Sequence, residues 1–105
     1  MDTKTDNQDL QDVIDLEAFA RESKPVPKAK SYRIRIDKEH YVVHQPSMTG
    51  TEILALAGKT PDKYHLYEHF HGGQTKVIQP TDRVDFTGPG VERFTTMKIE
   101  NTEGK

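Results

Sequence analysis

Residues 59–73 constrain the fold more than any other part of the chain. They supply a proline turn, then an alternating segment, and end at Gly72-Gly73, a dipeptide typical of a tight hairpin. Side chains of a strand point alternately to its two faces. Leu66 and Phe70 therefore fall on one face, which we expect to be buried, whereas Tyr67 falls on the other. The chain is predicted to form a strand here and to reverse directly into another.

A short helix is predicted just before this stretch. Thr49 and Glu52 have the spacing of a capping box, in which each side chain accepts a hydrogen bond from the other residue's backbone amide. The helix ends at Gly58, which tolerates a left-handed backbone. Its apolar face consists of Ile53, Leu56 and Ala57, with Leu54 at the margin. A helix of about two turns does not persist alone in water. It must therefore pack on a sheet.

Alternation identifies the other strands, because Tyr32, Ile34 and Ile36 are separated by arginines. The predicted strands cover residues 32–36, 41–44, 64–71, 75–79 and 91–99. We expect Val84, Phe86 and Phe94 to fill the core. The order strand, strand, helix, strand, strand predicts the α+β class, with a mixed sheet of four to five strands packed on one helix.

The 105 residues are enough for one domain, and the ends of the chain are too polar to belong to its core. Residues 1–30 are predicted to be a flexible N-terminal arm and linker, because Pro25 and Pro27 favour extended backbone. The domain is expected over residues 31–99, and residues 100–105 form a polar C-terminal tail.

Within this arm, Val13, Ile14 and Leu16 stand among acidic residues. Short acidic–apolar segments of this kind add to the edge of a sheet by β-augmentation. Such a segment could dock on its own domain, on another copy or on a partner enzyme. A nascent helix or a disordered tail explains the same residues and is the preferred interpretation, because the motif is only four residues long.

Several classes of function are excluded or disfavoured by composition. The chain has no cysteine, which excludes a thiol nucleophile and a zinc–thiolate site. It lacks the basic surplus of a nucleic-acid-binding domain, a signal peptide and the roughly 20 consecutive apolar residues of a membrane span. No Ser/His/Asp order or phosphate-binding loop stands out. We therefore expect a cytoplasmic protein that is not an enzyme and binds neither nucleic acid nor membrane.

His65, His69 and His71 share one face of the predicted strand and could suggest a metal site. Residues four apart in a strand are separated by about 13 Å, too far for the first two to bind one ion. A solvent-facing polar strand is the simpler interpretation, although a pH-dependent interface stays open. No metal and no cofactor is expected.

Residues 31–99 resemble ubiquitin-like domains, and most closely the bacterial multiubiquitin family. The resemblance is carried by the Tyr-x-Ile-x-Ile-Asp strand, the Thr-x-Thr-Glu-Ile-Leu-x-Leu-Ala-Gly helix, the Pro-Asp-x-Tyr-x-Leu strand and the Asp-x-Val-Asp-Phe segment before Glu-Arg-Phe. It implies the β-grasp fold. It also implies three partners, namely a ubiquitin-activating-like enzyme, a ubiquitin-conjugating-like enzyme and a JAB-type metallopeptidase.

The resemblance further implies a protein modifier that is joined to target proteins through an isopeptide bond at a C-terminal glycine. Gly104 is the only candidate in the tail. The chain departs from eukaryotic modifiers because Glu103 precedes this glycine and Lys105 blocks its carboxylate, so a peptidase must first remove Lys105. Tyr67, Thr95 and Met97 are expected to form the partner-binding face. A non-covalent ubiquitin-like adaptor is the alternative, and a sulfur carrier is a further one.

Overall fold

A computed structural model describes residues 13–27, 31–88 and 90–99. Its elements follow one another as β1 (Val13–Asp15), α2 (Leu16–Arg21), β2 (Ser31–Ile36), β3 (Glu39–Val43), β4 (Ser47–Thr49), α3 (Gly50–Leu56), β5 (Tyr64–Phe70), β6 (Thr75–Ile78), β7 (Arg83–Asp85) and β8 (Val91–Lys98). Among the described residues, no helix is long and apolar enough to cross a membrane.

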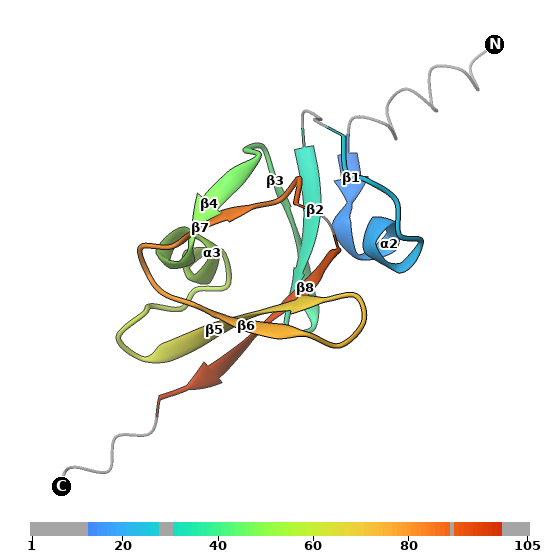
Figure 1. Cartoon of the computed structure of the whole chain (residues 1–105). Coiled ribbons are helices and arrows are strands. Elements are labelled where there is room, and N and C mark those ends of the chain that lie inside the picture. The colour runs from blue at the N-terminus through green and yellow to red at the C-terminus, as the bar shows by residue number, and fades with distance from the viewer. Residues whose placement is uncertain (1–12, 28–30, 89, 100–105) are drawn as a thin grey trace, which may run out of the picture.

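The main sheet has the strand order β1-β2-β8-β5-β6, and β3 pairs with β2 as a hairpin (Figure 1). β2 and β8 are parallel, with Ile36 opposite Phe94, whereas β5 is antiparallel to both β6 and β8. A mixed sheet with one main helix confirms the predicted α+β class. Three strands, β1, β4 and β7, were not expected. Each is three residues long, and β4 and β7 pair only with each other.

Helix α3 begins as the sequence predicts. The Thr49 hydroxyl accepts from the Glu52 amide at 3.2 Å, and the Glu52 carboxylate accepts from the Thr49 amide at 2.8 Å. The prediction for the apolar face was only partly right. Ile53 lies in the core as expected, but Leu54, rather than Leu56, is its fully buried neighbour.

Three aromatic rings form the centre of the core between the helix and the sheet. Phe86 packs edge-to-face on Phe94, with ring centroids 6.3 Å apart, and the Tyr32 ring lies 6.2 Å from that of Phe86. Each ring is at most 1% exposed. Val84 is also buried, so the predictions for Val84, Phe86 and Phe94 are confirmed.

The N-terminal segment differs from its prediction. β1 runs parallel to the start of β2, and α2 packs against β8 and β2 (Figure 1). Ile14 and Leu16 are 5% and 1% exposed, so a flexible arm is the wrong description of residues 13–21. A nascent helix or disordered tail is likewise wrong for β1, which docks on its own domain. Residues 1–12 and 28–30 lie outside the described residues.

The physical reason for this docking is an edge of β2 that β8 does not cover. The β2–β8 pairing reaches only Ile36, whereas β1 pairs with Ser31, Tyr32 and Arg33. Buried backbone amide and carbonyl groups need hydrogen-bond partners. β1 supplies them where β8 does not extend.

Candidate functional site

The strongest candidate for a partner surface is a patch on the outer face of the sheet, made of Tyr67, Val77, Thr95 and Met97. The strand register places Tyr67 directly between Val77 on β6 and Thr95 on β8. Met97 follows two residues after Thr95 on the same face and is 59% exposed; Val77 is 48% exposed. Tyr67 and Thr95 are half-buried. We call these four residues the outer patch.

The register brings together the three residues that the sequence predicted for this face, Tyr67, Thr95 and Met97. Their binding role remains a prediction. Val77 was missed, although a signal was present: Ile78 is apolar and next to it, so one of the two had to face outward. With Ile78 in the core, an exposed valine next to Tyr67 follows from strand alternation.

His69 lies at the margin of the outer patch and is fixed by two threonines. Its Nε2 atom is 2.7 Å from the Thr95 hydroxyl, and its Nδ1 atom is 3.3 Å from the Thr75 hydroxyl. Desolvation lowers the pKa of His69, and the positive charge of Arg93 lowers it further. The imidazole is therefore neutral at neutral pH, so it borders the patch without adding a charge. The described residues contain no group of three His, Cys, Asp or Glu side chains able to hold a metal ion.

The tail residues predicted for conjugation and processing, Gly104 and Lys105, lie outside the described residues. The last described contact before them is the hydrogen bond from the Ile99 amide to the Lys63 carbonyl at 2.8 Å. Lys98, at the end of β8, is exposed. β8 therefore ends at the surface, next to the turn before β5.

The N-terminal residues predicted to bind partners have a different environment. Ile14 and Leu16 belong to the core of their own domain and are not available to a partner in this arrangement, while Val13 is 37% exposed.

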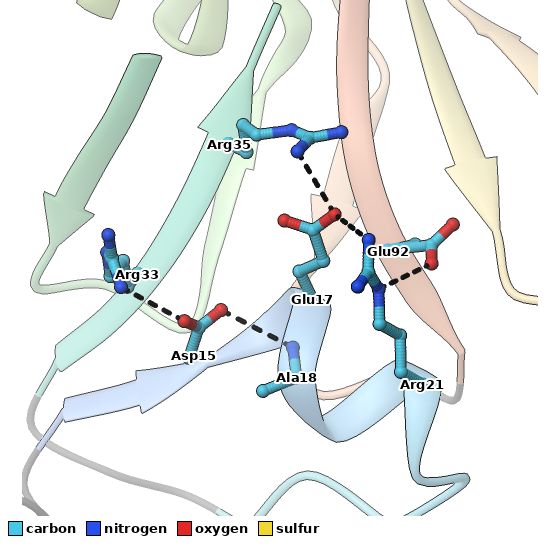
Figure 2. Close-up of polar contacts among 7 residues, drawn as sticks. All are labelled: Asp15, Glu17, Ala18, Arg21, Arg33, Arg35 and Glu92. Carbon is cyan, nitrogen blue, oxygen red and sulfur yellow. Dashed lines mark hydrogen bonds and ion pairs between the residues drawn. The ribbon is translucent and has the colours of Figure 1, made fainter. Parts of the chain in front are cut away.

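A row of ion pairs holds this segment on the sheet, and sequence reasoning missed it (Figure 2). Asp15 pairs with Arg33 at 3.1 Å, and Glu17 pairs with Arg35 at 3.2 Å. Arg21 contacts Glu17 at 3.0 Å and reaches Glu92 on β8 at 3.4 Å. Both segments carry charges at every second position: Asp15 and Glu17 are acidic, and Arg33 and Arg35 are basic. Nothing in the sequence indicated that these two segments lie side by side.

Glu68 is an unusual carboxylate because it lies on the core face of β5 and is only 6% exposed. Its cross-strand neighbours are Phe94 and Lys76. Desolvation raises the pKa of Glu68, and the charge of Lys76 opposes this effect only in part. Ionised Glu68 therefore costs stability in the folded state.

Replacing Glu68 with glutamine should stabilise the protein at neutral pH. Because the pKa of Glu68 is higher in the folded than in the unfolded chain, folding favours its protonated form. The wild type should lose stability relative to Glu68→Gln as pH rises from about 4.5 through the raised folded pKa, and the two should converge in more acidic solution. Urea unfolding across this pH range measures the difference. Glu39→Gln, at an exposed position of β3, is the control; equal pH dependence of both variants would contradict the assignment to Glu68.

From β2 onward, two strands, a helix and further strands on a mixed sheet are compatible with a domain of the ubiquitin-like class. Comparison with protein families supports this: the multiubiquitin family model matches residues 32–99. The chain belongs to the multiubiquitin family. Domains of this family are typically non-enzymatic protein modules. No match was found among curated proteins or among solved structures.

Proposed function

We propose that the protein is a bacterial ubiquitin-like modifier that is joined through Gly104 to target proteins. The observation that carries the proposal is the match of a ubiquitin-like family over residues 32–99, directly followed by a tail with a single glycine. The exposed end of β8 supports it, because Lys98 ends this strand at the surface of the domain.

The proposed reaction requires a free glycine carboxylate. A JAB-type metallopeptidase first hydrolyses the Gly104–Lys105 peptide bond and releases lysine. The activating enzyme, with a nucleoside triphosphate as co-reactant, then converts the free carboxylate into an activated acyl group. The conjugating enzyme passes this acyl group to an amino group of the target, where the amide bond forms as the activating group and a proton leave. Glycine suits this role because the absence of Cβ lets its backbone approach an active site closely.

The outer patch is the proposed recognition surface for these enzymes. Methionine adapts its shape to different partners, and tyrosine is among the residue types enriched at the centres of interfaces. Tyr67 on β5 and Met97 on β8 combine both properties on two paired strands. The proposed location is the cytoplasm.

The test is the intact mass of the protein after co-expression with the three cognate enzymes. A form lighter by one lysine should appear first, followed by adducts on other proteins. Gly104→Ala should abolish the adducts, whereas Asn101→Ala in the same tail should leave them unchanged. Adducts that persist in Gly104→Ala would exclude conjugation through this glycine.

A non-covalent adaptor is the second candidate, and Lys105 favours it because it blocks the glycine carboxylate. An adaptor would keep Lys105 and bind partners without a change in mass. Met97→Asp should then weaken partner capture, while Gly104→Ala should not. A sulfur carrier, the less favoured candidate, would instead show Gly104 as a thiocarboxylate.

A further inference from the structure

The outer face of the main sheet carries the exposed large hydrophobic side chains of the described residues, which are Val13, Val42, Val77 and Met97. Each of the three valines precedes a residue of the same strand that is buried in the core, so strand alternation turns the valine outward. Met97 and Val77 belong to the outer patch, on either side of the β5 strand that carries Tyr67. The apolar surface that a partner can cover is therefore concentrated on this face.

Arg93 lies at one end of the outer patch, and no carboxylate neutralises its guanidinium. The residue is on β8, two positions before Thr95 on the same face, and stands opposite His69 on β5. Its side chain makes no hydrogen bond or ion pair with another residue that the structure describes. Glu92, its neighbour in sequence, contacts Arg21 at 3.4 Å instead. The positive charge of Arg93 is thus left for an external group.

The arginines of the neighbouring strand show the opposite arrangement. On the same face of the sheet, Arg33 pairs with Asp15 at 3.1 Å, and Arg35 pairs with Glu17 at 3.2 Å. Arg93 is half-buried, so its charge is partly removed from water without this compensation. Burial of a charge is unfavourable unless the charge is paired. A carboxylate supplied by a partner would form a charge-assisted hydrogen bond with Arg93 and remove the penalty.

The shape of the patch favours a helix over an added strand. β5 pairs with a strand on each edge, so its backbone groups are already bonded. A segment lying on this face must satisfy its own backbone groups, as an α-helix does. Arg93 and Met97 are four residues apart on β8, or about 13 Å, with the Tyr67 pair midway. Eight residues of a helix span about 12 Å. Helix positions i, i+4 and i+8 therefore match Met97, Tyr67 and Arg93.

We propose that the outer patch binds an amphipathic helix of a partner protein and that Arg93 determines its specificity. Apolar side chains at positions i and i+4 cover Met97 and Tyr67, and an aspartate or glutamate at i+8 pairs with Arg93. This inference rests on the proposed function, because it names the chemistry of the partner at the same recognition surface. Arg93 selects acidic helices over basic ones, since a basic side chain at i+8 would meet a like charge.

A displayed library of random helical peptides, selected on the immobilised full-length protein, tests the proposal. Selected peptides should carry an acidic residue eight positions from an apolar one, in either direction, and Met97→Asp should abolish their binding. Arg93→Gln should weaken the best peptide about tenfold, as expected for the loss of a hydrogen bond between charged groups. Arg33→Gln is the matched control. It removes an arginine of the same face that already has a carboxylate, and should leave the affinity unchanged.

Two further measurements separate recognition from folding. Arg93→Gln should keep the wild-type urea midpoint, because the side chain has no polar contact within the described residues to lose. Replacing the acidic residue of the peptide by its amide should cost the same tenfold on the unchanged protein. Arg93→Glu should prefer the peptide in which lysine replaces that acidic residue.

Three results would overturn the proposal. They are a selection without an excess of acidic residues, an acidic preference that persists in Arg93→Gln, and the absence of any peptide whose binding depends on Met97. No enzyme takes part in these measurements. Conjugation without an acidic preference would remove this inference alone, whereas an acidic preference without adducts at Gly104 would remove only the proposed conjugation.

Discussion

Replacing Phe94 with alanine is expected to lower the free energy of unfolding by about 3–5 kcal/mol. Phe94 is fully buried, packs edge-to-face on Phe86 and stands opposite Ile36 where β2 meets β8. Removal of the Phe94 ring would leave a cavity where β2, β8 and the aromatic rings of the core meet. Small domains have a total free energy of unfolding of about 5–15 kcal/mol. A loss of this size would therefore remove a large part of the stability of the folded state. Urea unfolding followed by circular dichroism measures the loss.

Phe94→Leu is the matched control, since it keeps most of the apolar volume. It should cost clearly less than the alanine variant, by roughly 2 kcal/mol or more. Equal losses for the two variants would show that cavity size does not set the cost at this position.

Leu16→Ala is expected to destabilise the whole domain by about 2–5 kcal/mol, although it lies before the region that the family shares. Leu16 is 1% exposed and belongs to the same core cluster as Phe94. The expected effect distinguishes a segment that is part of the folded body from one that is only loosely attached. Urea unfolding gives the size of the loss, and amide hydrogen exchange along β2 shows where protection is lost.

Val13→Ala is the control for this variant, because Val13 is on the same segment but 37% exposed. Its cost should stay within about 0.5 kcal/mol, as for most surface substitutions. A Leu16→Ala variant as stable as Val13→Ala would mean that the segment contributes little to the core.

The body of the fold could be predicted because its local signals agree with its tertiary contacts. Strand alternation placed Tyr32, Ile34 and Leu66 on the buried face, and the capping box at Thr49 marked the start of α3. Strand alternation extends over five or more residues, so one residue that departs from it does not hide the pattern. Alternation also placed Tyr67 on the outer face, but Val77, its neighbour in the outer patch, was missed.

The docking of the N-terminal segment could not be predicted, because its cause lies elsewhere in the chain. β1 is three residues long, too short for a period to be visible. It forms because the β2–β8 pairing reaches no further than Ile36, a fact of tertiary geometry. Glu68 shares the face of Leu66 by strand alternation, but its burial depends on the closeness of Phe94 across the sheet rather than on its neighbours in sequence.

The pairing of β8 also determines how the protein responds to mechanical force. From Tyr64–Lys98 to Phe70–Val91, β5 and β8 are joined along nearly their whole lengths, with a bulge near His69. The Asp37 carboxylate adds a second anchor by accepting from both the amide and the hydroxyl of Thr96. A pull on the end of β8 acts along the strand, perpendicular to its ladder hydrogen bonds. These bonds must then break together in shear rather than one by one. We therefore expect a high unfolding force when the end of β8 is pulled.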